Sequence, residues 1–487
     1  MEKNTRTERD SLGSYEVPAD SLYGIFTARA LHNFKLSRQR APRVYIRAIG
    51  LVKKACAEAN ADVGFLDKKL SVAIQKAAQE LADGLYDSEY PLDLIQAGAG
   101  TPFNMNANEV IANRANEILG GKRGEYTPIH PNNHVNASQS SNDVTPTATR
   151  IAALFLIEPL LDSIKQLESS FAALALKHKN LIKVGRTHLE DAVPMSLGQE
   201  FGAFATMLKK THERFAKNRG ELLEVGLGGT ALGSGINTHP QFQKKVVSEL
   251  AKLTKLPLVA TRDLFETTAS MNNFVAVSNC CRMLAIDLTK IANDLKLLNM
   301  GPLAGIAEIT LPEVEPGSSI MPGKVNPSIA EAVQIASYDV IAGDTAIMLA
   351  AQAGQLQLNV MTPLIIKHLL GALSLLKNTC DMFRTDCVDG IVVNAEKITK
   401  LYEKSLVTAT ALNPYIGYEV TAELVKEALE KRISIIQVVR EKGFMEEKDL
   451  QKILSVESTT RPAIVNNLLK KKIARNEKYL TYAEKNK

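Results

Sequence analysis

The chain has 487 residues, a formal net charge of +5, 45% hydrophobic residues and no tryptophan. So small an excess of positive charge over this length is only weak evidence for nucleic-acid binding, and the basic residues near the C-terminus are typical of a solvated tail. Because aromatic residues make up only 5% of the sequence, the core must be largely aliphatic, which favours packed helices over a β-sandwich.

The cysteines predict a reducing compartment. No two of them have the spacing of a metal-binding or redox pair; they are Cys56, Cys280, Cys281, Cys380 and Cys387. Free and mostly buried thiols are therefore expected. The charged first residues lack the apolar segment of a secretory signal, and no run reaches the roughly eighteen apolar residues of a membrane span. We expect a cytoplasmic protein that binds neither membranes nor nucleic acid.

Helical patterns follow one another along the chain, and few segments alternate with a period of two. A mixed, mostly helical domain is expected over residues 1–140, a central helical domain over 141–395 and a small helical domain over 396–487. The first domain has helices expected at 45–61, 68–84 and 107–119. The central domain has them at 151–178, 330–352 and 363–377. Short amphipathic helices are expected in the last domain at 396–410, 419–430, 433–441 and 446–453.

The central helices are more apolar than one chain can bury. Leu284, Leu288, Ile291, Leu295 and Leu298 recur at spacings of four and three, as in the seam of a helix bundle. The helices at 330–352 and 363–377 leave little polar face, and such helices belong in a large core or a subunit interface. The sequence therefore predicts an all-α protein with a long central bundle shared between protomers.

Four polar loops interrupt the helices, at residues 98–106, 136–143, 185–191 and 317–327. They carry hydroxyls, amides, one histidine and one lysine, namely Thr101, Ser140, Ser141, Asn142, Thr187, His188, Ser318, Ser319, Lys324 and Asn326. This set suits a small dianion, because hydroxyl and amide groups donate to carboxylate oxygens without a metal. We expect no metal site and no cofactor, although a divalent activator cannot be recognised from sequence.

Each feature also has an ordinary structural explanation. The run 140–143 has the composition of a helix N-cap, which would still point helix-start amides at an anion. His188 is one of eight histidines, and a lysine such as Lys324 is by default a surface residue. The glycine-rich run 225–235 contains G-x-G-x-x-A but lacks a βαβ context. We interpret that run as a close-packed turn between helices and not as a dinucleotide site.

The fourth loop reads GSSIMPGKVNP and matches the signature of the aspartase/fumarase superfamily in full. The resemblance extends over nearly the whole chain, from D-S-L-G and V-P-A-D at residues 10–20 to A-L-N-P-Y-I-G-Y at 411–418. It implies a homotetramer of three-domain, mostly helical subunits with a twenty-helix core. It also implies that each active site takes loops from three subunits.

The resemblance further implies an anti elimination that releases fumarate through an aci-carboxylate intermediate. Ser318 would be the base, on a loop whose glycines allow it to close and exclude water. Glu331, seven residues after Lys324, would be the partner that orients His188. The resemblance assigns the remaining donors by position: Thr101, Ser140, Ser141 and Ser319 to the carboxylate that becomes the aci form, Lys324 and Asn326 to the other carboxylate, and Asn142, Thr187 and His188 to the leaving group.

Two members of the superfamily resemble the chain most, aspartate ammonia-lyase and class II fumarase. Ala99 and the run A-G-Q-L-Q-L-N-V-M at 353–361 are similar to the aspartases. The S-S-N-D run of the second loop, L-G-G-T at 227–230 and N-T-H-P at 237–240 are similar to the fumarases. Aspartases usually have threonine at the position of Ser141, and one methyl group is worth only about 1 kcal/mol of packing.

The resemblance therefore favours elimination of ammonia from L-aspartate, with hydration of fumarate as the alternative. A catalytically silent protein on the same fold is a third possibility. The intact residues Ser318, Lys324, Asn326, His188 and Glu331 argue against that possibility.

Overall fold

The computed structural model describes residues 4–485. Two compact units make up the chain. Residues up to Ile164, Lys210–Leu288 and Gln334–Cys380 form the first unit; Lys165–Lys209, Thr289–Val333 and the residues from Asp381 onward form the second. In the described residues the few strands are short and pair only in two-stranded ladders, so the predicted all-α class is confirmed.

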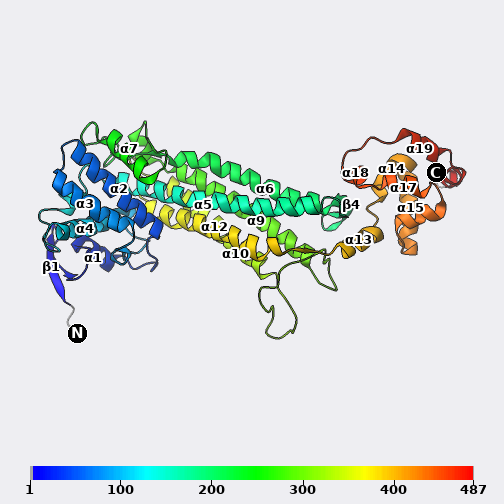
Figure 1. Cartoon of the computed structure of the whole chain (residues 1–487), viewed down its shortest axis with the longest axis horizontal. Coiled ribbons are helices and arrows are strands. Elements are labelled where there is room, and N and C mark those ends of the chain that lie inside the picture. Colours follow the sequence, from blue (N-terminus) through cyan, green and yellow to red (C-terminus); the bar gives the residue numbers. More distant parts are fainter. Residues whose placement is uncertain (1–3, 486–487) are drawn as a thin grey trace. The chain divides into compact units, whose positions relative to one another are not determined.

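The first unit begins with an antiparallel hairpin and a layer of helices. Its elements are β1 (Thr5–Asp10), β2 (Gly13–Pro18), α1 (Ile25–Asn33), α2 (Arg43–Asp62), α3 (Lys68–Ala82) and α4 (Thr101–Ile118). Helix α2 packs on α3, and α3 packs on α4 (Figure 1). The approach of α2 to α3 requires a glycine, because a Cβ on Gly50 would lie 2.9 Å from the carbonyl oxygen of Ala78. Helix α2 also packs on α7 (Phe242–Thr254).

Long aliphatic helices carry a large part of the buried core. They are α5 (Ser141–Lys177), α6 (Leu197–Asn218), α9 (Asn272–Asn299), α10 (Ser328–Gln352) and α12 (Gly371–Asp386), the last preceded by α11 (Thr362–Ile365) and a π-helical turn. The predicted seam on α9, Leu284 to Leu298, is buried, with at most 5% exposure at any of its five positions. The aliphatic helical core is therefore confirmed.

Helix α5 is the one helix in the described residues that is long and apolar enough, by length and composition, to span a membrane. However, 78% of its most apolar window is buried inside the protein. Burial in the core accounts for that composition, so the helix is only weak evidence for a membrane span.

The second unit contains a hairpin, an aromatic cluster and a group of short helices. The hairpin joins β3 (Ile182–Thr187) to β4 (Glu190–Ser196). Phe171 stacks edge-on against Phe204 and Phe383 at centroid distances of 5.5 and 6.5 Å. The C-terminal helices are α13 (Ala395–Lys404), α14 (Ala409–Ile416), α15 (Tyr418–Lys431), α16 (Ile435–Lys442), α17 (Glu447–Ile453), α18 (Val456–Thr460), α19 (Asn467–Ala474) and α20 (Glu477–Lys485). Most of them close over their own core around Leu412, Leu424 and Val438 (Figure 1).

Several boundaries differ from the expectations. Helices α4 and α5 begin six and ten residues earlier than predicted, at Thr101 and Ser141, so parts of the first two polar loops are helical. The third polar loop is the β3–β4 hairpin. Helices α5 and α13 begin close to the predicted domain boundaries, but the three-domain division itself stays a prediction. All five cysteines are free and buried, as expected.

Candidate active site

The first two polar loops meet in the first unit, where a cavity of about 970 Å³ is lined by Thr101, Ser140 and Ser141. Thr101 is the first residue of α4, and Ser141 is the first residue of α5. Two helix N-termini therefore border one space. Unpaired amides and the positive end of the helix dipole favour an anion at such a position. The cavity thus has the donors that a carboxylate needs.

The start of α5 is a reciprocal cap. The Ser140 hydroxyl oxygen accepts from the backbone N–H of Asn142 at 3.2 Å, while the Ser140 N–H donates to Asp143 Oδ1 at 2.9 Å. The capping explanation for this run is therefore correct. It does not exclude ligand binding, because a hydroxyl that accepts one hydrogen bond keeps its own proton to donate.

Asp143 fastens the glycine-rich run to the same helix start. Its Oδ2 accepts from the backbone N–H groups of Gly228 at 3.0 Å and Thr230 at 2.9 Å. Burial raises the pKa of Asp143 to about 6. A Cβ on Gly233 would lie 2.7 Å from the backbone of Phe265, so the run is a close-packed turn, as interpreted. The predicted ligand Asn142 is also engaged here, since its Nδ2 donates to the Ala231 carbonyl at 2.7 Å.

Thr101 is held by an unusual backbone. The two residues before it have positive φ values, 58° at Ala99 and 64° at Gly100. The Ala99 N–H donates to the Val360 carbonyl at 2.7 Å. A left-handed conformation at a residue other than glycine costs about 1–2 kcal/mol and is found where the surroundings enforce it. The first loop is therefore a rigid support for Thr101.

A buried lysine lies behind these hydroxyls and was not identified from the sequence. Lys53 on α2 is fully buried, and its Nζ donates to Asn104 Oδ1 at 2.6 Å, Gln139 Oε1 at 2.8 Å and Asn136 Oδ1 at 3.1 Å. Asn104 Nδ2 in turn donates to the Ser141 hydroxyl at 3.2 Å. Burial lowers the pKa of Lys53 to about 7. The only signal in the sequence was a lysine on the apolar side of a helix.

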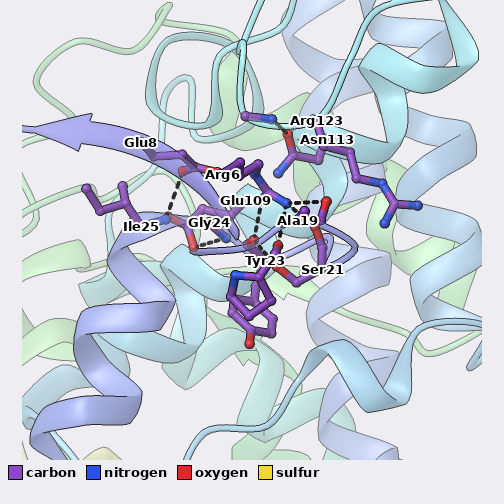
Figure 2. Close-up of polar contacts among 12 residues, drawn as sticks. Arg6, Glu8, Ala19, Ser21, Tyr23, Gly24, Ile25, Glu109, Asn113 and Arg123 are labelled. Carbon is purple, nitrogen blue, oxygen red and sulfur yellow. Dashed lines mark hydrogen bonds and ion pairs between the residues drawn. The ribbon is translucent and has the colours of Figure 1, made fainter. Parts of the chain in front are cut away.

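The start of α1 also borders the cavity. Two buried carboxylates accept hydrogen bonds from its backbone N–H groups (Figure 2). Glu109 accepts from the N–H groups of Gly24 at 2.9 Å, Phe26 at 2.8 Å and Thr27 at 3.1 Å. Glu8 accepts from the Ile25 N–H at 2.9 Å. Burial raises the pKa of Glu109 to about 7. These carboxylates satisfy the amides that an isolated helix start leaves free.

In the second unit, Thr187 and His188 lie at the tip of the β3–β4 hairpin. Thr187 pairs with Glu190, so His188 and Leu189 form a two-residue turn with φ values of 56° and 64°. Hairpin turns of this kind normally use Asn-Gly, because both central residues need positive φ. Two side chains are thus held in a costly conformation, and both are exposed.

Two hydrogen bonds hold the neck of the fourth loop, and the residues at its tip are exposed. The Gly317 N–H donates to the Lys324 carbonyl at 2.8 Å, and Asn326 Nδ2 donates to the Gly317 carbonyl at 2.7 Å. A Cβ on Gly317 would lie 2.6 Å from the backbone of both partners, so only glycine fits. Ser318 Oγ accepts from the N–H groups of Ile320 at 3.2 Å and Met321 at 3.0 Å.

The predicted site residues thus fall into two groups. Thr101, Ser140 and Ser141 share the cavity of the first unit, with Asn142 beside them. The second unit carries Thr187, His188, Ser318, Ser319, Lys324, Asn326 and Glu331. Glu331 is exposed on the first turn of α10. Within residues 4–485 of one chain, no group of three or more His, Cys, Asp or Glu side chains is arranged to hold a metal ion.

Comparisons with known proteins identify the family. A family model described as Lyase matches residues 13–342, and one described as Fumarase C C-terminus matches residues 408–461. The aspartate ammonia-lyase of Pseudomonas aeruginosa is 47% identical over 95% of this chain and 98% of its own length. The aspartate ammonia-lyase of Bacillus subtilis is 43% identical over 97% and 99%. The mitochondrial fumarate hydratase of Danio rerio is 44% identical over 91% and 88%.

Solved structures of the same family are also similar to this chain. The fumarate lyase:delta crystallin of Brucella melitensis, in a crystal structure with bound cobalt, has a TM-score of 0.89 and 44% identity over 92% of this chain and 98% of that one. A class II fumarase from Schistosoma mansoni has a TM-score of 0.89 and 34% identity over 93% and 98%. The signature loop, the helical fold and these matches together establish that the chain belongs to the aspartase/fumarase superfamily of lyases.

Proposed function

We propose that this chain is an aspartate ammonia-lyase, which converts L-aspartate reversibly to fumarate and ammonia. The observation that carries the proposal is the cavity of the first unit, which two helix starts and three hydroxyls border and behind which Lys53 is buried. This arrangement supports binding of an anion. High identity to two aspartate ammonia-lyases over nearly the full chain supports the choice of substrate.

The first role of the site is to hold the charge that develops. Removal of a proton from the carbon next to a carboxylate sends negative charge into that carboxylate, giving the aci form. Thr101, Ser140 and Ser141, with Ser319 from the fourth loop, would donate to its oxygens. Preorganised donors of this kind are typically worth about 3–4 kcal/mol each in the transition state. The rigid backbone before Thr101 and the cap at Ser140 support such preorganisation.

The second role is proton removal by Ser318. A serine is a poor base in water, so its alkoxide needs stabilisation. The two backbone N–H groups that already donate to Ser318 Oγ favour the anionic form of that oxygen. Closure of the loop would exclude water and bring Lys324 and Asn326 onto the second carboxylate. Lys324 is exposed in the single chain and free to make that contact.

The remaining residues would act on the leaving group. Asn142, Thr187 and His188 would surround the amino group as the carbon–nitrogen bond breaks. Glu331 would orient His188 or tune its charge. Both Glu331 and His188 are exposed in the single chain, so both side chains are accessible to other subunits.

The proposal includes a homotetramer whose active sites combine loops from three subunits. Apolar side chains of α9 and α10 support it, because five of them are between 48% and 71% exposed in the single chain: Ile286, Ile335, Tyr338, Met348 and Leu349. An exposed apolar surface of that kind marks an interface. The assembled enzyme would act in the cytoplasm on a small dicarboxylate, without a resident cofactor.

The alternative is a class II fumarase, which would add water to fumarate to give L-malate. Ser141 and its neighbours have the fumarase sequence, and fumarate hydratases match almost as well as the aspartases. The deciding experiment offers L-aspartate and L-malate separately and follows the ultraviolet absorbance of fumarate. Fumarate from aspartate is the expected result. Fumarate from malate alone would assign a fumarase, and fumarate from neither would remove both activities.

A further inference from the structure

We propose that Glu308 is a positioning residue that anchors, in one chain, both the hairpin carrying Thr187 and His188 and the segment carrying Ser318. The kinetic consequence of this inference rests on the proposed function, whereas its structural consequence does not. Glu308 lies in the second unit, ten residues before Ser318, and no sequence motif pointed to it.

The side chain of Glu308 is completely buried between two cations of the hairpin. Its Oε2 lies 2.7 Å from Lys183 Nζ, and its Oε1 lies 2.8 Å from Arg186 Nη1. Lys183 is itself only 2% exposed and makes a second ion pair, at 2.6 Å, with Glu200 on α6. Two carboxylates and two cations thus form one cluster with no net charge, in which Glu308 and Lys183 are buried and Arg186 and Glu200 are partly exposed.

The cluster contacts the hairpin at two places, Lys183 near its open end and Arg186 beside its turn. Lys183 and Arg186 are on β3, five and two residues before His188. Next to them, the strand makes a bulge at Gly185, where an added Cβ would lie 2.5 Å from the Val193 carbonyl oxygen. The direction of the strained turn that presents His188 therefore depends on how these two side chains are held.

The backbone of Glu308 fixes the root of the other segment. Its N–H donates to the Leu298 carbonyl, at the end of α9, at 2.8 Å, and its carbonyl accepts from the Asn394 N–H at 3.0 Å. The short strand β7 (Ile309–Thr310) follows and pairs with β8 (Val392–Val393). The chain then runs through residues 311–316 to the neck of the fourth loop.

Holding two segments with a buried charge costs more free energy than holding them with apolar side chains. The use of a charge here therefore indicates that the relative position of the two segments is important. A carboxylate in the interior pays a large desolvation cost, which close pairing with two cations offsets. In return, the hydrogen bond from Arg186 Nη1 to Glu308 Oε1 constrains both distance and direction, and the Lys183 contact, in which Oε2 accepts no aligned hydrogen bond within the described residues, constrains distance. A displacement of about 1 Å in a catalytic group can lower a rate on the order of a hundredfold. The cluster is therefore suited to orient both segments together.

The test is Glu308→Gln in the full-length protein, which keeps the shape of the side chain and removes its charge. Hydrogen exchange should become faster, by about fivefold or more, in both residues 182–196 and residues 311–327. With L-aspartate, or L-malate if that is the substrate, kcat should fall by roughly ten- to a hundredfold while KM changes less than about threefold.

The matched control is Asp344→Asn. Asp344 is also a buried carboxylate, 6% exposed, paired with Arg282 at 3.0 Å and Ser278 at 2.6 Å, but it lies on α10 away from both segments in sequence. It should leave exchange in the two segments and kcat unchanged. If Glu308→Gln speeds exchange in only one segment or in neither, or if kcat stays at the wild-type value, the inference is wrong.

If Glu308→Gln does not fold, Arg186→Met removes one of the two cations that contact Glu308, at a position that is 19% exposed. A fall in kcat with KM unchanged would then support Glu308 as the positioning residue. An unchanged kcat would overturn that role. If the wild-type protein converts neither substrate, the proposed function fails, but the exchange experiment still decides whether Glu308 holds both segments.

Discussion

The cavity of the first unit and the exposed segments of the second hold their polar groups in opposite ways. Around the cavity, the cap at Ser140, the chain of contacts from Lys53 through Asn104 to Ser141 and the strained backbone before Thr101 hold the groups in place before any ligand arrives. In the second unit, His188 lies on an exposed two-residue turn, and Ser318 lies on a loop whose neck is held by hydrogen bonds of Gly317.

This difference accords with a division between binding and chemistry. Donors that stabilise developing charge work best when they need no reorganisation, which favours a rigid cradle. A base on a closing loop must instead move, and moving elements have few buried contacts. The following predictions test the comparison, beginning with the largest expected effect.

Ser318→Ala should lower kcat on the order of a thousandfold or more, because it removes the proposed base. Since Ser318 makes only local contacts with the N–H groups of Ile320 and Met321, melting temperature and oligomeric state should not change. Steady-state kinetics and size-exclusion chromatography measure both. Ser163→Ala, within α5, serves as the control with normal turnover. Wild-type rates in the Ser318 variant would remove the assignment of the base.

Thr101→Val should reduce kcat/KM by roughly a hundred- to a thousandfold, because it removes one preorganised donor and keeps the side-chain shape. Thr149→Val is the matched control: the Thr149 hydroxyl donates to the Thr145 carbonyl inside α5 and does not border the cavity. The control should stay within about twofold of wild type, as expected for a hydroxyl remote from the substrate. Equal losses in the two variants would mean that the cavity is not the carboxylate site.

Glu109 should make stability depend on pH. Burial raises its pKa from 4.5 to about 7, so the folded chain binds more protons than the unfolded chain between those values. This contribution to stability is complete below about pH 4.5 and is lost as pH rises to about 7, a change on the order of 3 kcal/mol.

Glu109→Gln cannot titrate and isolates that contribution from its neighbours Glu8 and Tyr126. Thermal unfolding at pH 5 and pH 7 should show the wild type losing stability relative to this variant as pH rises. A constant difference between the two proteins would show that Glu109 has the same pKa in both states.

The smallest effect is expected at the strained turn. Leu189→Gly should stabilise the protein by about 0.5–1 kcal/mol, because relief of the left-handed conformation exceeds the entropy that glycine loses on folding. Leu189→Ala keeps the Cβ and should give no such gain. Since Leu189 is 75% exposed, lost packing contributes little to the comparison. Equal melting temperatures in both variants would argue that the turn is unstrained.

Local patterns predicted much of the fold. Aliphatic composition and helical spacing indicated most of the long helices, and the polar loops indicated the residues around the cavity. Helix α6 was missed although Phe201, Phe204 and Leu208 have helical spacing. The β3–β4 hairpin was missed because its turn is His188-Leu189, which lacks the usual Asn-Gly signal.

The sequence by itself determined the aliphatic helical class and, through the Gly317–Pro327 signature, the superfamily. Only the tertiary structure decided that Lys53 is buried behind the hydroxyls and that Glu308 contacts two segments. Lys53 meets Asn136 across 83 residues of sequence, and Arg186 meets Glu308 across 122. Local spacing sets which face of a helix is apolar, whereas the burial and pairing of a charge depend on every element that packs around it.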